Sequence, residues 1–193
     1  MKKIILSQKT RIIDYGQFSY TSKDHDLEQL IIPIPNSLNY IDSNAFSDCN
    51  KLTSIDIPFG VTYVGDGAFK ECTSLKYVKW SENTQTILED TFRECISLEK
   101  ITIPANVKFI DDYAFLNCKN LKEITIAPDN IIKFIGSKAF EGCNSLNVIH
   151  INDEKNTGIV INELEKCIID NKTKLFDIVI VDYMYNRKGI SHG

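Results

Sequence analysis

Long apolar runs, closely spaced cysteines and an excess of positive charge are all missing from this sequence. No apolar stretch reaches the roughly 18 residues that a membrane-spanning helix needs, so we expect no membrane insertion. After Lys2 and Lys3 the apolar run is only three residues long, against about 7–15 in a secretory signal peptide. The net charge of −4 argues against a nucleic-acid partner, because such binding depends on Lys and Arg neutralising phosphates.

The residue patterns of catalytic and metal sites are also missing. No two of the six cysteines form a Cys-x-x-Cys pair, which argues against a zinc cluster. The three histidines occupy unrelated positions, and no Ser-His-Asp spacing, phosphate-binding glycine loop or paired-carboxylate motif is present. We therefore expect a non-enzymatic protein with no catalytic residue, no metal and no cofactor.

What the sequence does contain is an internal repeat of about 23 residues. A Phe-x-x-Cys pair recurs at steps of 23, 23, 23 and 25 residues. The full unit reads Leu-x-x-Ile-x-Ile-Pro-x-x-Val-x-x-Ile-x-x-x-Ala-Phe-x-x-Cys. The pairs are Phe46/Cys49, Phe69/Cys72, Phe92/Cys95, Phe115/Cys118 and Phe140/Cys143.

The unit predicts two short extended segments and one helical turn in each coil. The spacing of Ile-x-Ile is that of a strand with one buried face, and Pro ends the strand because it cannot donate to a ladder. The second segment ends at Asp42, Gly65, Asp111 or Gly136, residue types that tolerate a tight turn. A helix N-cap residue follows in four of five coils, so we expect Ala-Phe-x-x-Cys to begin a short helical turn.

One coil cannot bury these apolar positions alone, so the sequence predicts a single stacked solenoid of about seven coils over residues 1–193. Residues 27–151 hold the regular repeats. Residues 1–26 and 152–193 are interpreted as degenerate terminal coils or caps. The residues that keep the register there are Ile4, Leu6, Ile13 and Phe18, then Ile159, Leu164 and Cys167, and after a short insertion Leu175, Ile178 and Ile180.

The repeat unit resembles the BspA-like class of leucine-rich repeats, chiefly through its Ala-Phe-x-x-Cys half. One copy departs from the pattern, with Trp80, Ser81, Thr84, Leu88 and Thr91 at consensus positions, and we expect that coil to be distorted. The resemblance implies a non-enzymatic solenoid that binds host or matrix proteins, often in adhesion at the surface of bacteria or protists.

The cysteines fall in one column, one per coil. They can act as small apolar plugs beneath the turn, or neighbours in the column can come within disulfide distance. We expect a structural ladder of buried, reduced thiols. Its members are Cys49, Cys72, Cys95, Cys118, Cys143 and Cys167.

A second column is largely aromatic and is the candidate partner-binding stripe. The residue before the buried position of the second extended segment is Tyr40, Tyr63, Thr86, Phe109 or Phe134. Because alternate residues of an extended segment point in opposite directions, these side chains should face outward. They can bind a partner, or they can pack on one another between coils and only stabilise the stack.

Three functions remain open on the sequence. The first is a protein-binding solenoid of the surface or adhesion kind, whose partner is a host protein, a matrix protein or another copy. The second is a cytosolic scaffold, and the third is the repeat domain of a larger enzyme or toxin. The absence of a readable signal peptide favours the cytoplasm for the chain as it stands, whereas a longer BspA-like parent would place it at the surface.

Overall fold

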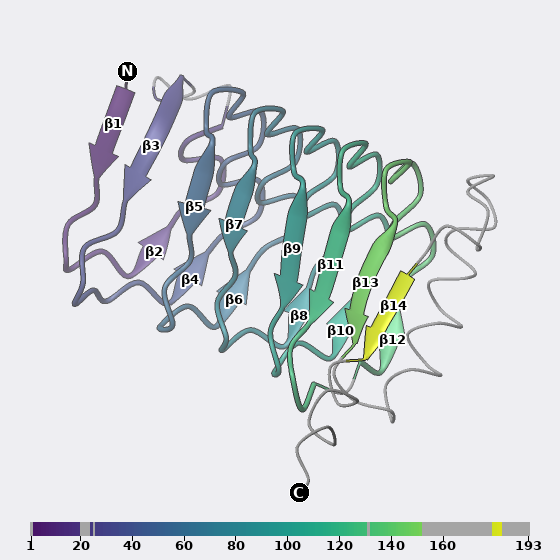
Figure 1. Ribbon diagram of the computed structural model, residues 1–193. Helices are drawn as coiled ribbons and strands as arrows, with labels where there is room; N and C mark the ends of the chain where they lie inside the picture. Colours follow the sequence, from purple (N-terminus) through teal and green to yellow (C-terminus); the bar gives the residue numbers. More distant parts are fainter. Residues whose placement is uncertain (1, 20–23, 25, 131, 152–178, 183–193) are drawn as a thin grey trace, which may run out of the picture.

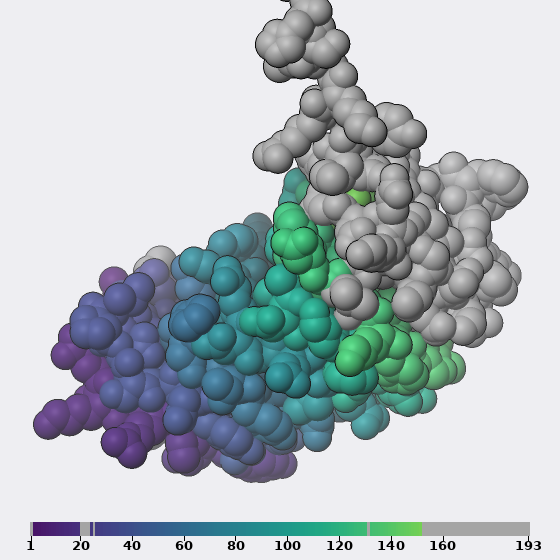
Figure 2. Space-filling view, turned by 90° about the horizontal axis from the view of Figure 1, so that it is seen from below, coloured from purple at the N-terminus to yellow at the C-terminus, as the bar shows by residue number. Residues whose placement is uncertain are grey.

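The computed structural model describes residues 2–19, 24, 26–130 and 132–151, together with the backbone of 179–182. The described chain winds into a solenoid in which each coil contributes two short strands (Figure 1). In Figure 2 the coils follow one another in sequence order along an elongated body. The predicted leucine-rich-repeat solenoid is confirmed.

The first strands of successive coils run parallel to one another in one layer, which hydrogen bonding divides into three sheets, and their buried residues alternate with outward ones. Its register keeps repeat positions level, as in the pairs Ile55↔Val78 and Ile124↔Ile149. The strands of this layer are β1 (Lys2–Ile5), β3 (Leu27–Ile31), β5 (Ser54–Asp56), β7 (Tyr77–Lys79), β9 (Lys100–Ile103), β11 (Glu123–Ile126), β13 (Val148–Ile151) and β14 (Val179–Asp182).

The second strand of each coil is only two residues long and forms a second parallel layer. In every case its second residue is buried and its first is half-buried or exposed, as the alternation predicts. These strands are β2 (Ile12–Ile13), β4 (Tyr40–Ile41), β6 (Tyr63–Val64), β8 (Thr86–Ile87), β10 (Phe109–Ile110) and β12 (Phe134–Ile135).

The expected helical turn is replaced by a run of tight turns, and the described residues contain no helix. In this segment alternate amides have different acceptors. Ala45 and Ser47 donate to carbonyls three residues back, whereas Phe46 donates to the Ala68 carbonyl of the next coil at 2.8 Å. In coils 2–6 two residues of this segment also have positive φ, for example Asn44 at 54° and Asp48 at 61°, and such residues cannot continue a right-handed helix.

The glycines that end the second segment serve close packing rather than left-handed geometry. Neither Gly65 nor Gly136 is among the positive-φ residues. A Cβ atom on Gly65 would overlap the main chain of Ser43 in the preceding coil, and one on Gly136 would overlap that of Asp112. The coils therefore approach each other too closely there for any side chain.

The core consists of columns that run along the solenoid axis. The phenylalanine rings stack with centroids 5.0–5.6 Å apart and are fully or almost fully buried. The column comprises Phe18, Phe46, Phe69, Phe92, Phe115 and Phe140. Because the rings continue from coil to coil, each coil buries its neighbour, as expected for a solenoid.

The two ends differ in how well the sequence register holds. Leu6, Ile13 and Phe18 are buried, as their alignment with the repeat predicts. At the other end, β14 pairs in parallel with β13 and sets Ile180 opposite Ile149. The sequence alignment would have set Ile180 opposite Ile151, so the predicted register was wrong by two residues. Ile159, Leu164, Cys167, Leu175 and Ile178 lie outside the described residues.

The coil around Trp80 interrupts both layers, at different boundaries. Within the described residues β7 pairs with β5 but not β9, while β8 pairs with β10 but not β6. The first strand of this fourth coil therefore joins only that of coil 3, because β5 does not pair with β3, and its second strand joins the later coils. Trp80 itself donates its indole N–H to Thr84 Oγ1 at 2.6 Å and meets Phe92 edge-on.

Candidate binding surface

The predicted aromatic stripe lies along the outward positions of the second strand layer. Tyr40, Tyr63 and Phe109 are half-buried, and Phe134 is 46% exposed. Register pairs align them from coil to coil, with Tyr40 opposite Tyr63 and Phe109 opposite Phe134. The stripe also extends to Ile12, which pairs with Tyr40 and is 48% exposed. The register of its neighbour Ile13 was predicted, but Ile12 itself was not included in the predicted stripe, which began at Tyr40.

Two members of the stripe pack directly on each other. The rings of Tyr40 and Tyr63 are parallel to within 12°, with centroids 4.4 Å apart. Burial raises the pKa of the Tyr63 phenol, and Tyr40 and the nearby carboxylates of Asp66 and Asp42 raise it further. Stacking between coils therefore occurs at this pair, and both side chains remain partly exposed.

The stripe is interrupted by a notch at Thr86. A hollow of about 370 Å³ opens there, at the boundary where β6 and β8 do not pair. Its lining comprises Thr62, Tyr63, Val64, Asn83, Gln85, Thr86 and Leu88. Since Tyr40 covers one face of the Tyr63 ring, the other face is turned towards this hollow. The stripe is thus two apolar halves with a partly polar notch between them.

The cysteine column lies in the core, away from the stripe. Five cysteines are buried and form no disulfide, and each Sγ donates to the carbonyl of a phenylalanine in the preceding coil at 2.9–3.2 Å. These five are Cys49, Cys72, Cys95, Cys118 and Cys143. Burial raises the pKa of Cys72, Cys95 and Cys118, so these thiols stay protonated. Cys167 lies outside the described residues.

Two further hollows lie beside Trp80, near the ends of the first strands. They measure about 530 and 510 Å³ and share Lys79, Trp80 and Glu82 as a common wall. Phe59 borders one of them and is 68% exposed. The irregular sequence of this coil was a signal of distortion but gave no indication of a hollow.

Neither metal chemistry nor a membrane helix finds support in the described part of the chain. No group of three or more His, Cys, Asp or Glu side chains there could hold a metal ion. None of the described residues forms a helix with the length and hydropathy of a membrane span. The described residues thus form outward strand surfaces, hollows and stacked core columns, and no cluster of metal-binding side chains is found among them.

Comparison with known families accounts for the repeat. A family profile described as "BspA type Leucine rich repeat region" matches residues 1–122 and 110–180, in six copies. The chain belongs to the BspA-type leucine-rich repeat family. A comparison with curated protein sequences found no match.

Solved structures of bacterial leucine-rich repeat proteins resemble this BspA-type domain. The T. pallidum protein TpLRR is 26% identical with a TM-score of 0.56, and the match covers 62% of this chain and 55% of TpLRR. A leucine-rich repeat protein from Bacteroides ovatus is 26% identical with a TM-score of 0.53, over 79% of this chain and 50% of that one. One from Eubacterium ventriosum shares the fold at 23% identity and a TM-score of 0.54, over 72% and 42%. The BspA-type domain spans about half the length of these structures.

Proposed function

We propose that this BspA-type repeat domain binds another protein through the aromatic stripe, in an adhesion or surface-interaction role. The observation that carries the proposal is the alignment of Ile12, Tyr40, Tyr63, Phe109 and Phe134 on one outward column. Aromatic side chains are favoured anchors in the centres of protein interfaces. The partner is a host protein, a matrix protein or a second copy of this chain. The family resemblance supports the surface role.

The proposal is tested by removing rings from the stripe and measuring stability and binding separately. Tyr63→Ala and Phe109→Ala are compared with the parent by thermal unfolding and by binding to immobilised extracellular-matrix proteins, with self-association followed by sedimentation. If the stripe binds a partner, binding or self-association is lost in both variants, and the melting temperature falls more in Tyr63→Ala, whose ring stacks on Tyr40, than in Phe109→Ala. Lower stability with intact binding would mean that the rings only pack the coils together.

Thr102→Ala is a suitable control, because Thr102 is an exposed residue on the first strand layer and far from the stripe in the coil. It should change neither measurement. A loss of binding in this control equal to that in Tyr63→Ala would move the interface to the other layer.

A further inference from the structure

Negative charge borders the aromatic stripe on one side. Immediately after the second strand of coils 1–5 come six carboxylates, which we call the acidic edge: Asp14, Asp42, Asp66, Glu89, Asp111 and Asp112. No Lys or Arg occupies these two positions in any of the six coils. The acidic edge thus accompanies the stripe over most of its length.

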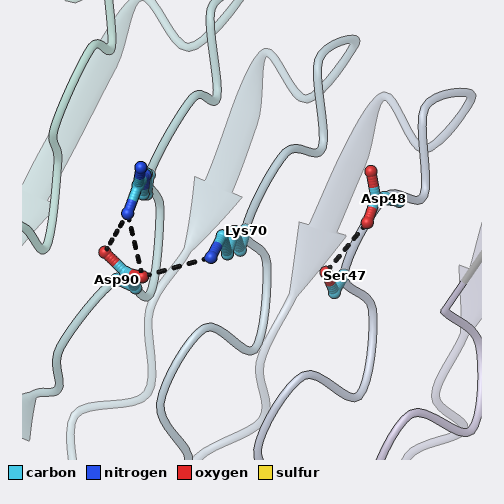
Figure 3. A network of polar contacts seen from close by, with 5 residues as sticks. Ser47, Asp48, Lys70 and Asp90 are labelled. Carbon is cyan, nitrogen blue, oxygen red and sulfur yellow. Dashed lines mark hydrogen bonds and ion pairs between the residues drawn. The ribbon is translucent and has the colours of Figure 1, made fainter.

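The charges of the acidic edge are not neutralised within the described residues, where none of its carboxylates joins an ion pair. Asp90, only one residue beyond the edge, differs: Lys70 and Arg93 reach its carboxylate at 3.3 and 3.4 Å (Figure 3). The pKa of Asp111 is raised by burial and then by Asp112 and Asp66. Asp66 thus raises the pKa of a neighbour in the acidic edge, Asp111, and of a stripe residue, Tyr63.

Part of the acidic edge has a local structural role, and part has none. Asp42 Oδ1 accepts the Ser43 N–H at 2.7 Å, and Asp112 Oδ1 accepts the Ser137 N–H at 2.6 Å. The side chains of Asp66 and Glu89 make no hydrogen bond within the described residues, and both are exposed. Backbone capping therefore does not explain why these two residues are charged. Asp66 and Glu89 lie in the two coils on either side of the notch.

The notch has the chemistry to hold a cation. The open face of the Tyr63 ring bounds it on one side, and a cation placed over such a ring is attracted by the ring's quadrupole. Asn83 and Gln85 are among its lining residues, and their side-chain amide oxygens can accept hydrogen bonds. Carboxylates that lack an internal partner can form charge-assisted hydrogen bonds with an incoming ammonium or guanidinium group.

We propose that the notch between Tyr63 and Thr86 receives a Lys or Arg side chain from an extended segment of the partner protein, with the acidic edge facing its positive charge. This inference rests on the proposed function, since the flanking residues of the segment lie on the two apolar halves of the stripe. The occupant is a basic protein segment, because the surface supplies negative charge on one side and aromatic rings on the other.

The experiment uses the whole chain and a library of random 12-residue peptides displayed on phage. Peptides enriched on the parent chain are then tested on a Tyr63→Ala/Phe109→Ala double variant, which should bind them weakly. Enriched peptides should contain Lys or Arg flanked by apolar residues. A labelled enriched peptide and its analogue with Gln in place of the basic residues are then titrated by fluorescence anisotropy. The Gln analogue should bind at least about tenfold more weakly, and binding of the parent peptide should fall with added salt.

Two variants address the notch itself. Thr86→Phe places a ring where the stripe lacks one and fills the hollow, and Asp66→Asn/Glu89→Gln removes charge without changing shape. Each should weaken the basic peptide by at least about tenfold while leaving the fold intact. Asp56→Asn/Asp129→Asn, both exposed and away from the stripe, makes the same change in net charge and should have little effect.

The failures are distinguishable. Enriched peptides without basic residues, or unchanged binding in Thr86→Phe, would overturn the cation notch and leave the proposed function standing. Peptides that bind the Tyr63→Ala/Phe109→Ala variant as well as the parent would overturn the proposed function. If the Asp56→Asn/Asp129→Asn control weakens binding equally, the peptide is attracted only by the net negative charge of the protein, and the proposed cation site in the notch is rejected.

Discussion

At the scale of the residue, the thiols of the cysteine column have a defined hydrogen-bonding role. The Phe69 carbonyl accepts the Cys72 N–H at 3.2 Å within its coil and the Cys95 Sγ at 3.1 Å from the next coil. Both lone pairs of that buried oxygen are thereby satisfied. A cysteine at this position is more than an apolar plug, because it pairs a carbonyl that the tight turns leave half-satisfied.

The buried thiols should make the protein less stable in alkali. Folding raises the pKa of Cys72, Cys95 and Cys118 above their ordinary value of 9.0. The unfolded chain therefore loses these protons first. Their stabilising contribution is full below pH 9.0 and is lost as pH rises towards the folded pKa. Each thiol should lower the free energy of unfolding by about 1.4 kcal/mol per pH unit in that window.

Denaturant unfolding between pH 8 and 10.5 measures this effect. Tyr and Lys side chains also titrate there, so the informative quantity is the difference between the parent and Cys95→Ala. Because this variant has one buried thiol fewer, its free energy of unfolding should fall less steeply with pH. Parallel pH profiles for the two proteins would show that Cys95 does not ionise on unfolding in this range. A thiol reagent should react slowly with the native protein, whereas after denaturation it should react with all six cysteines.

At the scale of the element, the fourth coil divides the strand layers while the turns stay continuous. Gly67 and Phe69 still donate to Glu89 and Thr91 across the boundary, at 2.9 and 3.0 Å. On the strand side, the described residues show no bond from the Gln85 or Leu88 amide to coil 3. The equivalent amides one coil later, those of Lys108 and Asp111, do donate hydrogen bonds to coil 4. The boundary between coils 3 and 4 is therefore open in the second strand layer, and it is closed at the turns and in the first layer, where β5 pairs with β7.

Hydrogen exchange should reveal this difference within one coil. We expect the Gln85 and Leu88 amides to exchange faster than their equivalents Lys108 and Asp111, which donate to coil 4 at 2.7 and 2.9 Å. The Gly67 amide, on the turn side of the same boundary, should remain protected and is the internal control. Equal protection of Gln85 and Lys108 would show that the second strand layer is continuous in solution.

The strands could be predicted from the sequence, whereas the turns could not. Alternation around Ile55 and Ile124 fixes which face is buried, because a strand has a side-chain period of two. Phe and Cys three residues apart indicate only that both side chains point inward, which a helix and a series of tight turns satisfy equally. The choice depends on Phe46 donating to Ala68 in another coil, and a contact between coils leaves no mark on spacing within one coil.

The candidate site was predicted to a similar depth. The stripe positions Tyr40, Tyr63, Phe109 and Phe134 follow from alternation, so their outward direction could be predicted. The notch could not, because it arises where β6 and β8 fail to pair and has no residue pattern of its own. The carboxylates of the acidic edge can be read from the sequence, but their positions indicate only turn and cap residues. The structure adds that none of them joins an ion pair within the described residues.

At the scale of the whole molecule, stability passes from coil to coil. Each described coil contacts chiefly its neighbours, so the free energy of folding is approximately a sum of coil and interface contributions. The last described coils follow the same rule. Phe140 and Ile151 are almost fully buried, and β13 is paired on both sides, with β11 and with β14.

Removal of residues 159–193 should therefore destabilise the end of the solenoid. The deletion takes away β14 and leaves β13 as an unpaired edge, whose free N–H and C=O groups and open apolar face favour association. We expect lower thermal stability and aggregates or oligomers in size-exclusion chromatography with light scattering. A chain that ends at residue 182 keeps β14 and is the matched control, expected to remain close to the parent. If the shorter chain is monomeric and as stable as the parent, residues 159–193 do not cap the solenoid, because a cap cannot be removed without exposing the coil beneath it.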